Sequence, residues 1–180
     1  MSRDRRLDFE QFLALLRHQS HLPRRIESIH LHHTWRPNHG QWRGAASIEG
    51  MRRHHMVERG FSDIAQHLTV DPGGGLWPGR DWRRPPASSL GIDPVTRRRA
   101  NGFADAGPFM IEVVGDFDEG KDVLRGEQRA ATVKVLAALL RAHGLVAADA
   151  AAEQVLTAVT ERIVPHHRMD AGKSCPGSGL

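Results

Sequence analysis

The chain has 180 residues, 39% of them apolar and 26% charged, which is typical of one globular domain and excludes a disordered chain. No apolar run reaches the roughly 20 residues of a membrane-spanning helix, and the charged stretch 1–10 lacks the apolar core of a signal peptide. The net charge of +4 favours a polyanionic partner, although an arginine-rich coding bias is an alternative explanation. We therefore expect a monomer without a membrane span, cytoplasmic as synthesised, with its one cysteine, Cys175, reduced.

The first expected element is a helix over residues 7–19, because apolar residues there have the i, i+3, i+4, i+7 spacing of an amphipathic helix. These residues are Phe9, Phe12, Leu13 and Leu16. Pro23 ends the pattern. We interpret residues 1–25 as a helical extension that packs on the main domain, residues 26–180.

Residues 26–34 alternate in character and predict a strand. Side chains alternate between the two faces of a strand, so the odd-numbered positions face the core and the even-numbered ones face a polar side. His32 then points to the polar side, whereas His33 is expected to be a hydrogen-bonded core histidine. His30, on the same side as His32, is either a partner of that residue or a plain surface histidine.

The remaining periodic segments alternate between helix and strand. Residues 81–108 have no periodicity, and a connection of this length inside a compact domain is usually functional or mobile. The pattern predicts a single α/β domain with a central mixed β-sheet flanked by helices. In chain order, the expected elements are a helix over 47–59, strands over 64–70, 76–80 and 109–117, and helices over 127–143 and 149–159.

The C-terminal loop contains the closest group of potential metal-binding and catalytic side chains in the sequence. Cys175 follows His166 and His167 by nine and eight positions, and Lys173 by two. A thiolate and an imidazole on one loop can face the same ion, and a catalytic zinc has three nitrogen, sulfur or oxygen ligands from the protein and one open position. The third ligand would come from the histidines around His32. A buried inert thiol beside surface histidines is the alternative interpretation.

Several short motifs, taken in order, resemble those of the zinc-dependent N-acetylmuramoyl-L-alanine amidases of the peptidoglycan recognition superfamily. The resemblance covers roughly residues 26–177 and implies their fold. The motifs are His32-His33-Thr34, Asp63 to His67, Gly79-Arg80, Ile111 to Gly115, and His167-Arg168 with Lys173 to Gly177.

The resemblance implies one zinc ion held by His32, His167 and Cys175. It also implies hydrolysis, by a zinc-activated water, of the amide between N-acetylmuramic acid and L-alanine in peptidoglycan or muropeptides. Lys173 matches a family lysine that can stabilise the oxyanion, although a solvated loop lysine is the alternative. Trp35 and Arg80 are candidates for substrate contacts, with residues 81–108 as one wall of the groove.

The same resemblance identifies a candidate base. Many members have a catalytic tyrosine where this chain has Gln66, and this chain has no tyrosine. Members that recycle muropeptides instead have a glutamate in the motif Ile-Glu-x-x-Gly, which occurs here at 111–115. Glu112 is therefore the expected general base, and Gln66 is expected only to orient substrate or water. A structural buried glutamate is the alternative for Glu112.

Two other functions remain open at the level of sequence. A non-catalytic peptidoglycan-binding module of the same fold is one, although such members typically lack the cysteine ligand. A nucleic-acid-binding protein using Arg97-Arg98-Arg99 is the other, but no recognition motif accompanies these arginines, so no nucleic acid is expected. An amidase of this kind would reach a cell wall only after release or non-classical export.

Overall fold

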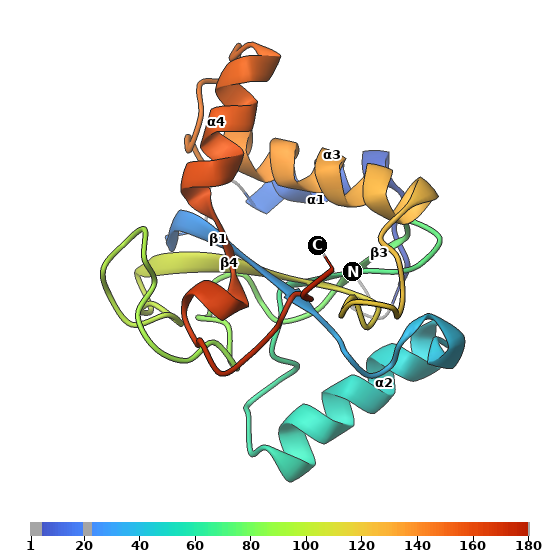
Figure 1. Ribbon diagram of the computed structural model, residues 1–180. Coiled ribbons are helices and arrows are strands. Elements are labelled where there is room, and N and C mark those ends of the chain that lie inside the picture. Colours follow the sequence, from blue (N-terminus) through green and yellow to red (C-terminus); the bar gives the residue numbers. More distant parts are fainter. Residues whose placement is uncertain (1–4, 20–22, 180) are drawn as a thin grey trace.

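The computed structural model describes residues 5–19 and 23–179, which fold around one mixed β-sheet (Figure 1). The strands lie in the order β3-β2-β4-β1-β5. The elements are α1 (Phe9–Gln19), β1 (Arg25–His33), η1 (His39–Gln41), α2 (Ala45–Arg53), η2 (His54–Glu58), β2 (Leu68–Val70), β3 (Leu76–Pro78), β4 (Ala106–Val113), α3 (Gly126–Ala142), α4 (Ala152–Arg162), β5 (Ile163–Pro165) and η3 (His166–Arg168).

Strands β2, β4, β1 and β5 run parallel, and only β3 is antiparallel, as the second half of a hairpin with β2. Every residue of β4 is buried. This agrees with the expectation that its apolar run forms a central strand, because strands covered on both faces lack polar alternation. The predicted fold class, a single α/β domain with a mixed sheet, is confirmed.

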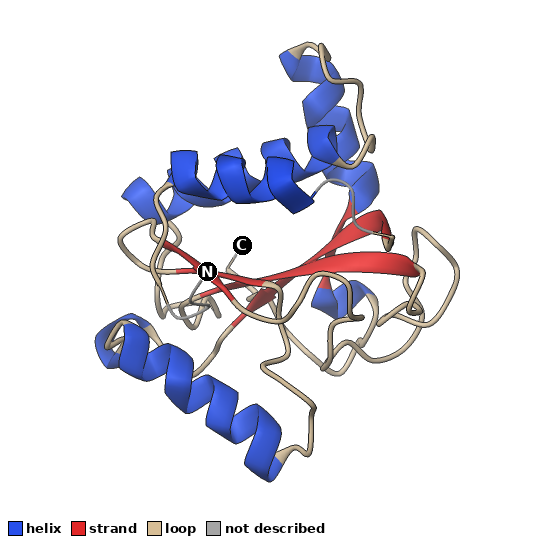
Figure 2. Cartoon of the chain, turned by 180° about the vertical axis from the view of Figure 1, so that it is seen from behind, coloured by secondary structure: helices blue, strands red, loops and turns tan. Residues whose placement is uncertain are grey.

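Helices α1 and α3 cover one face of the sheet, and α2 lies on the opposite side (Figures 1 and 2). The odd-numbered side chains of β1 pack toward α3, since Ile29 belongs to the main core with Val135 and Leu139 of that helix. A smaller cluster joins Ile48 of α2 to Trp77 of β3. From Ser28 onward, the even-numbered side chains of β1 therefore lie on the face away from α1 and α3, as the alternation predicted, whereas Ile26, on the other side of a register shift, belongs to the main core.

Several boundaries differ from those expected. The helix over 47–59 begins earlier, at Ala45 after Gly44, and its last turn is π-helical. Strand β2 has only three residues, and α4 starts after Ala151 rather than at Asp149. The largest difference is β5, which sequence periodicity did not reveal because its three residues directly continue the last helix. Within the described residues, no helix has the length and apolarity to cross a bilayer.

Helix α1 shares the core of the sheet rather than lying on its surface. Phe12 is fully buried, in the same cluster as Phe109 of β4, and its ring centroid is 6.2 Å from that of Trp82. The division at residue 25 remains a prediction, but the packing makes α1 part of the folding unit.

Truncation of Phe12 tests how much this packing contributes to the free energy of unfolding. Phe12→Ala is expected to lower the free energy of unfolding by about 3–5 kcal/mol, the usual cost of truncating a buried phenylalanine. Phe103→Ala is the matched control, since Phe103 is 44% exposed, and should cost less than about 1 kcal/mol. Chemical denaturation of both variants gives the comparison. If both variants lost the same free energy of unfolding, Phe12 would contribute no more than an exposed phenylalanine, and α1 would not be part of the core.

Candidate metal centre

The register of three parallel strands brings the candidate side chains to one place. His32 of β1 pairs with Glu112 of β4, and paired residues of neighbouring strands point to the same face. On the other side of β1, Leu31 pairs with Pro165 of β5. The next residue, His166, therefore follows beside His32, where the carboxyl ends of β1 and β5 meet.

His32, His166 and Cys175 form a compact group of metal-ligand type. One donor atom of each lies within 4.8 Å of the others, and the two imidazole rings have centroids 4.4 Å apart. His166 Nε2 is buried and has no hydrogen-bond partner within the described residues. A buried polar atom without a partner is costly, and a metal ion would satisfy it. Two imidazoles and a thiolate are ligands that zinc takes, so the residues present fit that ion.

The protonation preferences of this group suit a cation. Burial, with the neighbouring His166, holds the pKa of His32 well below its usual value, and burial lowers that of His166. Both rings are thus neutral, as ligation requires. Burial raises the pKa of the Cys175 thiol to about 12, so the thiolate depends on a bound cation to replace its lost hydration.

Cys175 is positioned by backbone contacts of the C-terminal loop. Its carbonyl accepts a hydrogen bond from His167 N (2.7 Å), and its Sγ accepts one from His33 N (3.4 Å). Gly177 packs so closely on Phe117 that an added Cβ would lie 2.3 Å from the carbonyl oxygen of Phe117. Only glycine fits this approach, which explains the Gly after Cys175-Pro176 in the motif.

The structure corrects one expected metal ligand, because it groups His166 rather than His167 with His32 and Cys175. His167 is exposed and uses its backbone N–H to hold Cys175, whereas His166 is buried beside His32. The physical reason is β5, whose pairing with β1 fixes which of the two adjacent histidines lies next to His32. Without β5, the sequence offered no way to choose between them by parity.

Glu112 lies on the same face as His32, next to the metal-ligand group. Its carboxylate is buried and, among the described residues, has no hydrogen bond or ion pair. Burial alone raises the pKa of Glu112 to about 8. A buried carboxylate without a partner is unfavourable for stability, and perturbed groups of this kind concentrate in functional sites.

Gln66 and Arg80 have mainly structural contacts. Gln66 Nε2 donates to Thr69 Oγ1 (2.9 Å), and Thr69 pairs with Glu112 in the sheet. The Arg80 guanidinium is buried and donates to the carbonyls of Asp63, Ile64 and Pro85. These contacts join the segments before and after the β2–β3 hairpin, so the expectation that Arg80 contacts substrate gains no support from its geometry.

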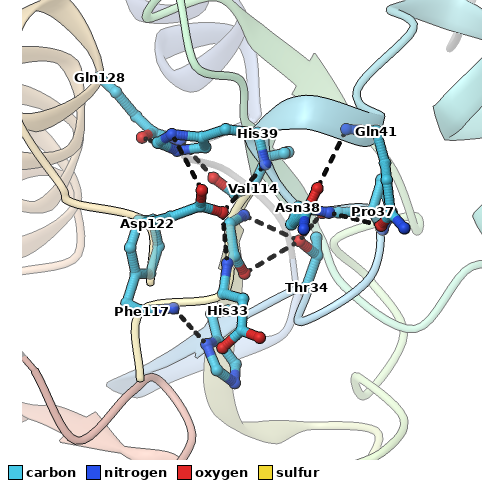
Figure 3. Close-up of polar contacts among 12 residues, drawn as sticks. His33, Thr34, Pro37, Asn38, His39, Gln41, Val114, Phe117, Asp122 and Gln128 are labelled. Carbon is cyan, nitrogen blue, oxygen red and sulfur yellow. Dashed lines mark hydrogen bonds and ion pairs between the residues drawn. The ribbon is translucent and has the colours of Figure 1, made fainter. Parts of the chain in front are cut away.

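Trp35 follows Thr34 in the loop after β1, and Figure 3 shows polar contacts of neighbouring residues that hold this loop in place. Thr34 Oγ1 donates to the carbonyl of Pro37 (2.6 Å), and the Asp122 carboxylate accepts from His39 N (3.0 Å). The Trp35 side chain itself is 53% exposed. It is therefore an accessible aromatic surface next to the end of β1.

The structure adds a polar network that sequence reasoning missed. His30 is fully buried, with Nε2 2.9 Å from Asp93 Oδ2 and Nδ1 3.3 Å from Ser89 Oγ. Ser89 Oγ also lies 3.2 Å from His32 Nε2, and Ser28 Oγ donates to Asp93. Ser89 and Asp93 come from the aperiodic stretch 81–108, where no local pattern marked them.

Comparison with known proteins decides the family. Residues 22–178 match the family described as N-acetylmuramoyl-L-alanine amidase. The chain belongs to this amidase family. No curated protein matches it. The family includes zinc amidases, and the group His32, His166 and Cys175 is a possible metal site of that kind.

Solved structures of the amidase fold align with most of this chain at low identity. The amidase LysC from Clostridium intestinale URNW is 17% identical, with a TM-score of 0.60, over 88% of this chain and 80% of that one. A mutant of Drosophila PGRP-LB in complex with tracheal cytotoxin is 18% identical, with a TM-score of 0.57, over 89% of this chain and 80% of that one. PGRP-LE in complex with tracheal cytotoxin, a monomeric diaminopimelic acid-type peptidoglycan, is 18% identical, with a TM-score of 0.59, over 88% of this chain and 78% of that one.

Proposed function

We propose that this member of the amidase family hydrolyses the amide between N-acetylmuramic acid and L-alanine in peptidoglycan or muropeptides. The observation that carries the proposal is the placement of Glu112 beside His32 on one sheet face, next to His166 and Cys175. These residues supply three candidate zinc ligands and, in the same location, a carboxylate that no other described residue pairs with. That combination is the minimal set for metal-assisted amide hydrolysis.

His32, His166 and Cys175 would hold the zinc ion. Zinc with three protein ligands and an open position supplies Lewis-acid chemistry, lowering the pKa of water to about 7 and polarising a carbonyl. Glu112 takes the proton of the attacking water and returns it to the leaving amine of L-alanine. No hydrogen bond or ion pair with another described residue occupies its carboxyl group, so this group is available for the transfer.

Lys173 and Trp35 complete the proposed site. Both side chains are exposed, and Lys173 lies two residues before Cys175 on the same loop. An ammonium there would stabilise the oxyanion that forms on the scissile carbonyl. The Trp35 ring offers an apolar surface for a sugar or peptide. The PGRP-LB mutant and PGRP-LE bind tracheal cytotoxin, a monomeric diaminopimelic acid-type peptidoglycan, which supports the same substrate class here.

The bond cut can be identified from the products. Incubation with purified muropeptides should release stem peptides that begin with L-alanine and leave glycan without peptide, and chelation of the metal should stop the reaction. Mass spectrometry of the digest, with and without chelator, measures both. New reducing sugar ends would indicate glycosidase chemistry and contradict the proposal.

A non-catalytic peptidoglycan-binding module is the second candidate, because the chain has glutamine at the position of the family tyrosine, Gln66. The same digest separates the two functions. A binding module would retain the muropeptide through gel filtration but leave it intact with zinc present.

A further inference from the structure

His30 of β1 and the loop residue Ser89 connect the proposed zinc ligand His32 to a buried loop carboxylate, Asp93. The contacts run from Asp93 Oδ2 to His30 Nε2 (2.9 Å), from His30 Nδ1 to Ser89 Oγ (3.3 Å), and from Ser89 Oγ to His32 Nε2 (3.2 Å). Each of these side chains is buried. Water therefore does not compete for the hydrogen bonds, and each group depends on the next one.

The direction of each hydrogen bond follows from the donors available. The Asp93 carboxylate only accepts, so His30 Nε2 must donate to it. Full burial disfavours a charged imidazole, so His30 Nδ1 carries no proton and accepts from the Ser89 hydroxyl. That hydroxyl has one proton, and once it is donated to His30, Ser89 Oγ can only accept from His32 Nε2–H.

We propose that Asp93, His30 and Ser89 are positioning residues that hold the His32 proton on Nε2 and leave the Nδ1 lone pair free for the metal. This inference rests on the proposed function, in which His32 is a zinc ligand. The role is a choice of tautomer: neutral imidazole has one ring nitrogen protonated, and only the other can bind a metal.

The loop is built to keep Asp93 in this orientation. Asp93 Oδ1 accepts from the backbone N–H groups of Val95 and Thr96, while Oδ2 accepts from Ser28 and His30. Both carboxylate oxygens are thus occupied, and the carboxylate cannot rotate without breaking backbone contacts. The fold of this loop thereby sets the tautomer of His32, which gives the aperiodic stretch a role beyond that of a groove wall.

The first test uses the wild-type protein. Long-range ¹H–¹⁵N correlation spectra of protein with ¹⁵N-labelled histidine distinguish protonated from unprotonated ring nitrogens and identify the nitrogen that binds zinc. We expect His32 with Nε2 protonated in the metal-free protein and Nδ1 as the ligand after addition of zinc. Zinc bound through Nε2 of His32 would overturn the inference while leaving the zinc site standing.

The second test reverses the direction of the hydrogen bonds. Asp93→Asn is nearly isosteric, and its amide oxygen would stay with Val95 and Thr96, so its NH₂ group would face His30. The amide would then donate to His30 Nε2, and each later bond would turn round, placing the His32 proton on Nδ1. Metal-free Asp93→Asn should therefore show the opposite His32 tautomer, a change that general loosening of the loop would not produce.

Zinc affinity provides an independent measurement, by competition with a chromophoric chelator. Ser89→Ala and Asp93→Asn should weaken zinc binding by about 10- to 100-fold, the usual effect of removing a partner of a metal-ligating histidine. Ser88→Ala is the matched control, because Ser88 precedes Ser89 in the same loop and its hydroxyl contacts only Met110 Sδ within the described residues. It should change the affinity less than about twofold.

The outcomes separate this inference from the proposed function. If wild type binds no zinc but His32 is protonated on Nε2, the zinc proposal fails and the tautomer assignment holds. If wild type binds zinc, and Ser89→Ala and Asp93→Asn bind it as tightly as Ser88→Ala does, the inference fails alone. Circular dichroism of each variant identifies one that has lost its fold, and the wild-type spectra then decide.

Discussion

Glu112→Gln should lower turnover of a defined muropeptide by about 100- to 10,000-fold, the contribution of a positioned general acid or base. Glutamine keeps the shape of the side chain but cannot exchange a proton near neutral pH. The variant should retain its zinc and its fold, since Glu112 is not one of the metal-ligand group and has no partner among the described residues to lose. The rate is measured at saturating substrate, by quenching the reaction at set times and quantifying the products by mass spectrometry.

Gln66→Ala is the control variant for the turnover of Glu112→Gln. Gln66 stands where many family members have the catalytic tyrosine, and its Nε2 donates to Thr69 Oγ1. If Gln66 only orients neighbouring groups, its loss should reduce turnover far less than the loss of Glu112. A Glu112→Gln variant with full zinc and near-wild-type turnover would make Glu112 a structural residue and place the base elsewhere.

The parts of the fold with strong local periodicity could be predicted from the sequence. Alternation over 26–34 was sufficient to place His30 and His32 on the face away from the main core, and the apolar run around Glu112 was sufficient to predict a central strand. Both follow from side-chain direction in a strand and need no knowledge of neighbours. The resemblance then supplied Cys175 as a ligand, and the structure brings its Sγ to the two histidines.

The parts that the sequence could not supply depend on pairing between distant segments. Strand β5 has three residues and no periodicity of its own, and it exists because β1 has a free edge that it can pair with. The contacts of Ser89 and Asp93 with β1 span about sixty residues of chain, so no local pattern could reveal them. Arg80 was predicted to contact substrate, but its guanidinium donates to backbone carbonyls of the loop segments on either side of the β2–β3 hairpin.

The pair of adjacent histidines allows a test of the metal centre that needs no substrate. His166→Ala should remove stoichiometric zinc and with it the activity, because it deletes a ligand whose Nε2 is buried without a hydrogen-bond partner in the described part of the chain. His167→Ala should keep one zinc ion per chain, because His167 is exposed and contributes its backbone N–H, which alanine retains, to Cys175. Elemental analysis after gel filtration gives both values.

The two substitutions remove the same side chain from neighbouring positions, but His166 is buried and His167 is exposed, so circular dichroism has to show that His166→Ala keeps its fold before the zinc contents are compared. Cys175→Ser gives the second half of the argument, since a hydroxyl is a much poorer zinc ligand than a thiolate, and it should lose zinc as His166→Ala does. The reverse pattern, with zinc lost from His167→Ala and kept by His166→Ala, would restore His167 as the ligand. It would also require the η3 turn after β5 to rearrange when the metal binds, because only then could the exposed histidine reach His32 and Cys175.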